Sequence, residues 1–166
     1  MKAIDGLFIL TLTFKIVESC STGKIYDLTY YFESSTNDIL TCDNRAPVKA
    51  VSPGIYALNG PPALASIWDS KTNTNAYHCT MTEYFFIPAL PYYVLITTFG
   101  DDYITVKIND VQVSEISTTA QCTYQVDKVA TSYIKPGLNK LYIDANNQGS
   151  YGLFAYRLKI VSKFAA

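Results

Sequence analysis

The segment 103–108 alternates in polarity along its whole length, and this pattern constrains the fold more than any other feature. Its aliphatic side chains are Ile104, Val106 and Ile108. Because successive side chains of a β-strand point to opposite faces, the pattern predicts a strand buried on one face. Asn109 and Asp110 follow the segment, and both residue types tolerate a positive φ. They predict a tight hairpin turn into residues 111–113.

The rest of the chain is built from similar short runs. Alternating or apolar runs occur at 24–32, 79–87, 92–99, 123–129, 140–145 and 153–161. Turn residues separate these runs, and no stretch sustains helical periodicity over three turns. Short strands in this number predict an all-β fold, an antiparallel β-sandwich or a barrel. With 166 residues, the chain is long enough for one domain with a substantial core.

Composition excludes two kinds of partner. The formal net charge is −1 and charged residues make up only 16% of the chain, so attraction to a phosphate backbone is not expected. No run of about 18 or more apolar residues occurs, so a membrane span is not expected either. We therefore predict neither a nucleic-acid partner nor a membrane-spanning segment.

The first 19 residues have the composition of a secretory signal peptide. Lys2 gives a positive start, residues 6–14 are mostly apolar, and Ser19 is a small residue before Cys20. This predicts a secreted protein whose single domain spans residues 20–166. The alternative is a first buried strand, because Phe8, Leu10 and Leu12 alternate with more polar neighbours.

Four cysteines remain after such a cleavage: Cys20, Cys42, Cys79 and Cys122. An even number in a secreted domain predicts two disulfides, for which three pairings exist. We predict the pairs Cys20–Cys42 and Cys79–Cys122. No Cys-x-x-Cys pair occurs, so a structural zinc site is not expected.

The second half of the chain, roughly residues 63–161, resembles the galactose-binding-like jelly-roll domains found among carbohydrate-binding modules. The resembling segments are 84–88, 100–109, 134–143 and 147–153, and residues 66–69 resemble the family's aromatic segment before the central strands. Asp110 stands where that family usually has glycine, so the hairpin turn is expected to differ. The resemblance implies a jelly-roll β-sandwich and a carbohydrate or glycoprotein as the partner. Fold alone does not settle function, because members of the family also bind other ligands or act as spacers.

Asp101 and Asp102 give a weaker resemblance to the PA14 domains of some adhesins. There, two adjacent aspartates hold calcium, which in turn binds sugar hydroxyls. Calcium at Asp101 and Asp102 is therefore one hypothesis, with loop oxygens completing the coordination. The favoured alternative is that one carboxylate caps the turn and the other is solvated, because adjacent strand side chains point to opposite faces.

Aromatic and amide side chains supply the other candidate ligand contacts. An aromatic ring matches the apolar CH face of a pyranose, and amides bond to its hydroxyls. The candidates are Trp68, Tyr103, Asn146, Asn147, Gln148 and Tyr151. The alternative for Trp68 is a place in the core, and the alternative for residues 146–148 is simply to make a turn.

Nothing in the sequence supports catalysis. His78 is the single histidine, no Gly-x-Ser-x-Gly motif occurs, and no pair of opposed carboxylates is recognisable. We therefore predict a secreted, non-enzymatic, lectin-like carbohydrate-binding module. The alternative is a structural protein that self-assembles into an extracellular coat, fibre or lattice through exposed aromatics and strand edges.

Overall fold

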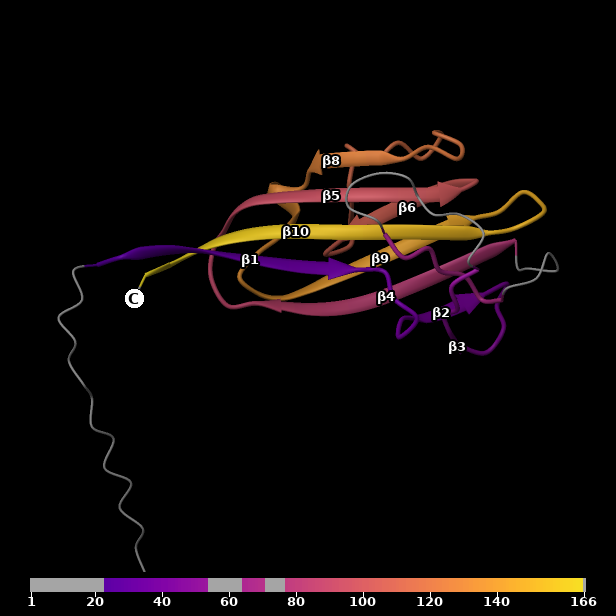
Figure 1. Cartoon of the computed structure of the whole chain (residues 1–166), viewed down its shortest axis with the longest axis horizontal. Helices are drawn as coiled ribbons and strands as arrows, with labels where there is room; N and C mark the ends of the chain where they lie inside the picture. Colours follow the sequence, from indigo (N-terminus) through magenta and orange to yellow (C-terminus); the bar gives the residue numbers. More distant parts are fainter. Residues whose placement is uncertain (1–22, 54–63, 71–76, 166) are drawn as a thin grey trace, which may run out of the picture.

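The chain folds into two stacked antiparallel sheets (Figure 1). The structure is a computed structural model, which describes residues 23–53, 64–70 and 77–165. One sheet, here the β5 sheet, has the order β1 (Ile25–Glu33), β10 (Leu153–Ala165), β5 (Pro91–Asp101), β8 (Gln125–Val129). The other, the β9 sheet, has the order β3 (Val48–Lys49), β2 (Ile39–Cys42), β4 (His78–Ile87), β9 (Gly137–Asn146), β6 (Tyr103–Ile108), β7 (Val111–Gln112). The predicted all-β sandwich is confirmed, and the only helical element in the described residues is a 3-10 turn, η1 (Thr131–Tyr133).

The core lies between the sheets and follows the alternation of the strands. On β6, Ile104, Val106 and Ile108 are at most 1% exposed, as the pattern predicted. They belong to the same core cluster as inward side chains of the β5 sheet, which include Ile96 on β5 and Phe154 and Leu158 on β10. Burying an aliphatic side chain of this size stabilises a fold by about 1.5–3 kcal/mol. This row therefore anchors β6 and, with it, the loops at both of its ends.

The predicted hairpin turn at Asn109 and Asp110 is confirmed. The two residues have φ values of 52° and 66° and join β6 to β7. Two consecutive positive φ values are what a two-residue hairpin turn of type I′ requires. The Asn109 amide also donates to the Tyr133 carbonyl at 2.7 Å, and Lys140 pairs with Asp110 at 2.7 Å. Asp110, which stands where the resembling family usually has glycine, therefore adopts the positive φ and also forms an ion pair with Lys140.

Trp68 belongs to the core and does not lie on a surface. The residue is 0% exposed, and its ring meets Phe154 edge-on with centroids 6.1 Å apart. Two isolated bridges, Val51 with Trp68 and Ile67 with Phe154, hold this segment against the sandwich. Its burial removes Trp68 from the candidate ligand contacts.

The predicted disulfide pairing is wrong. The structure joins Cys42 to Cys79, and Cys122 carries a free, exposed thiol. Cys42 on β2 lies directly opposite Cys79 on β4, a register that brings the two Cβ atoms close together. Cys20 and the predicted signal peptide lie outside the described residues. Within the described ranges, none of the helical structure has the length and apolar character needed to cross a membrane.

Candidate functional site

Three loops meet at one end of the sandwich, which we call the loop end (right side of Figure 1). They are the β5–β6 connection, the loop before β8 and the β9–β10 loop. The Asp102 N–H donates to the Asn146 carbonyl at 2.8 Å, and the Cys122 N–H donates to the Asp102 carbonyl at 2.8 Å. Asp102 therefore ties the three loops together through its backbone.

The carboxylates of Asp101 and Asp102 converge at this end. The peptide bond between them is cis. One oxygen of each carboxylate and the Cys122 sulfur all lie within 4.8 Å of one another. The expectation that the two carboxylates point apart is therefore wrong, because it assumed regular strand geometry at both residues.

Asp102 is buried and its carboxylate is held by protein donors. Gln121 donates from Nε2 to Oδ1 at 2.8 Å, and the Gln148 N–H donates to Oδ2. Burial by itself raises the pKa of Asp102, but hydrogen bonds from Gln121, Gln148 and Cys122 outweigh it and lower that pKa below its ordinary value. Asp102 is thus an ionised carboxylate that orders the loop end.

Cys122 completes this cluster as a protonated thiol. Its Sγ lies 3.2 Å from Asp101 Oδ1 and 3.6 Å from Asp102 Oδ1. Desolvation of the sulfur and the two neighbouring carboxylates raise the pKa of Cys122 to about 12. Burial and the charge of Asp102 also raise the pKa of Asp101, although the bond from Cys122 opposes them. At neutral pH the S–H group donates into the carboxylate pair.

This donor set does not fit calcium. Calcium takes six to eight oxygen ligands, and here the third converging group is a soft sulfur that carries a proton. Both oxygens of Asp102 already accept hydrogen bonds from the protein. The cluster is therefore not assigned as a calcium site.

A rung of three side chains crosses the outer face of the β9 sheet beside the cluster. His78 on β4 pairs with Asn146 on β9, which pairs with Tyr103 on β6. Asn146 is exposed, and His78 and Tyr103 are half-buried. Asp144 accepts from the Asn146 amide at 3.0 Å and meets His78 Nε2 at 2.9 Å. The rung presents an aromatic ring, an amide and an imidazole on one face.

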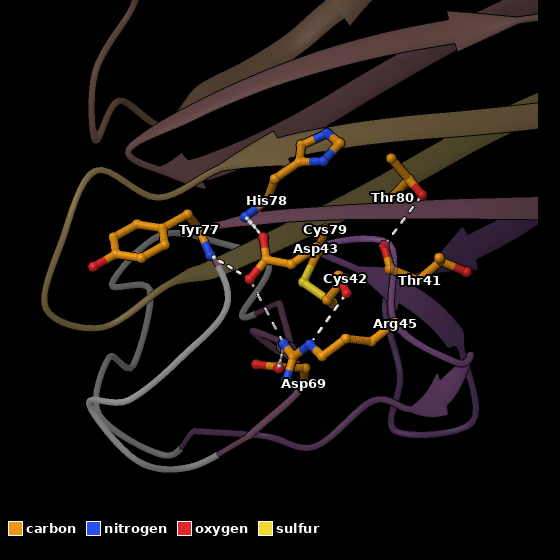
Figure 2. A network of polar contacts seen from close by, with 9 residues as sticks. All are labelled: Thr41, Cys42, Asp43, Arg45, Asp69, Tyr77, His78, Cys79 and Thr80. Atoms are coloured by element: carbon orange, nitrogen blue, oxygen red, sulfur yellow. Dashed lines mark hydrogen bonds and ion pairs between the residues drawn. A yellow bond between two sulfur atoms is a disulfide. The ribbon is translucent and has the colours of Figure 1, made fainter.

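The network in Figure 2 fixes the β4 end of this rung. The Asp43 carboxylate accepts from the N–H groups of Tyr77 at 3.2 Å and His78 at 3.0 Å. Arg45 donates to the Cys42 carbonyl at 3.2 Å and pairs with Asp69 at 2.6 Å. The Cys42–Cys79 disulfide closes the same corner. His78 therefore begins β4 at a position set by both covalent and polar links.

The remaining predicted residues divide between surface and interior. Gln148 is exposed and Tyr151 is half-buried in the β9–β10 loop. Asn147 is 4% exposed, and its Oδ1 accepts from the Gly149 N–H at 3.0 Å, so it shapes the turn. Sequence reasoning missed Gln121, because only the fold brings the loop before β8 to this end.

Comparisons with known proteins give one distant likeness. No family model matches the sequence, and no curated protein matches it. A solved structure described as a family 35 carbohydrate binding module from an environmental isolate is similar to this chain. The two share 17% identity over 82% of this chain and 97% of that one, with a TM-score of 0.41. At that level, the function has to be argued from the residues of this chain.

Proposed function

We propose that this protein is a secreted, non-enzymatic carbohydrate-binding module whose ligand contacts the loop end. The observation that carries the proposal is the rung in which the Tyr103 ring stands next to the exposed Asn146 amide. A ring beside a hydrogen-bonding group matches a sugar, which has an apolar CH face edged with hydroxyls.

Each side chain at this end has a distinct role. Tyr103 packs on the sugar ring, and Asn146 and Gln148 bond to hydroxyls. Tyr151 adds a second ring from the neighbouring loop. Asp101 accepts a hydroxyl hydrogen bond, while Asp144 holds the Asn146 amide in place at 3.0 Å. Binding then needs no metal ion.

The non-enzymatic part of the proposal rests on the surroundings of His78. Its Nε2 lies 2.9 Å from Asp144 Oδ1. A hydrolase triad contains such a pair of histidine and carboxylate, but it also needs a nucleophile bonded to the histidine. Among the described residues, no serine, threonine or cysteine side chain is hydrogen-bonded to His78. Secretion is supported by the Cys42–Cys79 disulfide, because such bonds persist in oxidising compartments.

A glycan array probed with the labelled full chain, followed by calorimetry on the hits, tests the function. Tyr103→Ala and Asn146→Ala are expected to weaken binding at least about tenfold, the loss of roughly 1.4 kcal/mol of contact. Tyr26→Ala is the control, because Tyr26 is 50% exposed on β1, far from the rung. Absence of glycan binding by the wild-type chain overturns the proposal.

A self-assembling structural protein is the second candidate, and exposed apolar groups favour it. Ile25 and Tyr26 on the edge strand β1 are 64% and 50% exposed. Tyr84, Phe86 and Leu138, on the outer face of the β9 sheet, are 61%, 63% and 59% exposed. Unprotected edges and apolar patches favour association with further copies. Light scattering over a concentration series distinguishes the two functions: growing oligomers without glycan binding support assembly.

A further inference from the structure

A cleft of about 470 Å³ opens on the outer face of the β5 sheet, on the opposite side of the sandwich from the Tyr103 rung. Its floor is formed by two rows of side chains that cross three strands. Tyr31, Lys159 and Leu95 form one row, and Glu33, Arg157 and Thr97 form the other. Asp127 on β8 closes the far side. A volume of this size falls in the range of roughly 300–1,000 Å³ that small-molecule sites occupy.

The polar groups of the cleft are held in place before any ligand arrives. Arg157 donates from Nε to Glu33 Oε2 at 2.7 Å, and a terminal guanidinium nitrogen forms an ion pair with the same oxygen at 2.6 Å. The guanidinium also lies 5.9 Å from the Tyr31 ring centroid. Thr97 and Asp127 exchange two hydrogen bonds, at 3.2 and 3.0 Å. Groups fixed in this way lose little conformational entropy when a ligand binds.

Arg157 is unusually buried for a charged residue on the outside of a sheet. Its side chain is only 14% exposed, and it lies in the floor of the cleft beside Glu33. Arginine is seldom buried unless it is paired. The cleft is therefore a shaped depression with ordered charges, and not merely a flat solvated face.

The chemistry of the cleft favours a neutral, polyhydroxylated ligand. Its four charged groups, Glu33, Asp127, Arg157 and Lys159, sum to a formal charge of zero, so no net attraction exists for an anion or a cation. Tyr31 is 56% exposed and offers an aromatic face, and Leu95 adds an apolar floor. Lys159 has no carboxylate partner among the described residues, which leaves its three N–H groups available to hydroxyl oxygens.

We propose that this cleft is a second carbohydrate site, which takes one or two neutral pyranose rings stacked on Tyr31. The inference rests on the proposed function for the class of ligand, but it uses none of the residues of the loop end. A chain with sites on two faces would bind two glycan strands at once and gain avidity from doing so.

Isothermal titration of the full chain with lactose, cellobiose, N,N′-diacetylchitobiose and mannobiose tests the proposal. The expected result is two sites per chain for at least one disaccharide. Tyr31→Ala is expected to reduce the stoichiometry to one, or to raise the Kd at least about tenfold. Tyr26→Ala is the matched control, with the same residue type on the same strand and comparable exposure. Circular dichroism confirms that each variant is folded.

The outcomes separate this proposal from the proposed function. If Tyr103→Ala abolishes binding while Tyr31→Ala has no effect, the proposed site in the cleft is overturned and the proposed site at the loop end is supported. If Tyr31→Ala abolishes binding and Tyr103→Ala has no effect, the proposed site in the cleft is supported and the proposed site at the loop end is overturned. Binding of none of the four disaccharides, or of galacturonic acid disaccharide alone, overturns the neutral-sugar cleft.

Discussion

The Trp68 ring lies directly against the α-carbon of Gly152. A methyl group at Gly152 would come within 2.4 Å of ring carbon Cε2 and 2.5 Å of Cζ2. Since Trp68 is fully buried, the ring has little room to move away. The β9–β10 loop, which carries Gln148 and Tyr151, is thereby seated on the core.

Gly152→Ala is expected to destabilise the protein by about 1–3 kcal/mol, the usual cost of overpacking a filled core. Urea denaturation followed by circular dichroism measures the change. Gly23→Ala is the control, because nothing lies within 4 Å of a methyl group there. Equal urea midpoints for Gly152→Ala and Gly23→Ala would contradict this prediction and show that the Trp68 ring can move to accommodate the methyl group.

Removal of the Cys42–Cys79 disulfide is expected to lower the free energy of unfolding by about 2–4 kcal/mol, because the bond closes a loop in the unfolded chain. The double variant Cys42→Ala/Cys79→Ala, compared with the wild type in urea, gives the value. Cys122→Ser is the control for loss of a thiol. Peptide mapping without reductant should recover Cys42 and Cys79 in one linked fragment, and a fragment linking Cys79 to Cys122 would contradict the structure.

Cys122 is expected to react slowly with iodoacetamide despite its exposure. Its pKa of about 12, raised by desolvation and by the two carboxylates, leaves little thiolate at pH 8. Allowing for the greater nucleophilicity of a more basic thiolate, the rate falls on the order of 50-fold below that of an ordinary thiol. Mass spectrometry of the peptide containing Cys122 measures the rate. Asp101→Asn should accelerate alkylation, because it removes one of the charges that raise the pKa of Cys122. An unchanged rate would show that the Asp101 carboxylate does not control the reactivity of Cys122.

Glu83 is expected to make stability fall as pH rises from about 4.5. Its side chain lies in the core-facing row of β4, where burial, followed by the charge of Asp38, raises its pKa above 4.5. The folded state therefore holds the Glu83 proton to higher pH than the unfolded chain, so the stabilisation is present below 4.5 and is lost as pH rises through the raised pKa. Urea denaturation of the wild type and Glu83→Gln from pH 4 to 7 tests this. A difference between them that stays constant with pH would refute it.

Glycan binding is expected to be unaffected by EDTA. The cluster of Asp101, Asp102 and Cys122 presents a protonated thiol where calcium would require oxygen. Calorimetry with EDTA, and then with added calcium, should give the same Kd. A Kd that rises about tenfold or more with EDTA and returns with calcium would restore the metal hypothesis.

Local features of the fold were predictable because they depend on neighbouring residues. The alternation of residues 103–108 gave a strand with Ile104, Val106 and Ile108 inward, and Asn109 and Asp110 gave the hairpin turn. The apolar run at residues 92–99 also gave β5, in which Val94 to Thr98 are all buried, whereas Tyr92 and Tyr93 are 44% and 42% exposed. In each case the physical cause lies within a few residues.

Contacts between distant strands were not predictable in the same way. The Cys42–Cys79 bond depends on the β2–β4 register, which no spacing between cysteines reveals. Asp101 and Asp102 converge where the chain departs from regular strand geometry. The cleft joins Glu33 to Arg157 across 124 residues of sequence. A pattern read along one strand contains no information about its neighbours in the sheet.

The first and last strands run side by side, with Ile25 opposite Ala165, at the end of the sandwich away from the loop end (Figure 1). A biosensor surface or a fluorescent carrier joined at either strand end would therefore leave the Tyr103 rung facing the solution. Attachment at the ends of β1 or β10 therefore sets the orientation of the protein on a surface without changing any residue that we assign to recognition.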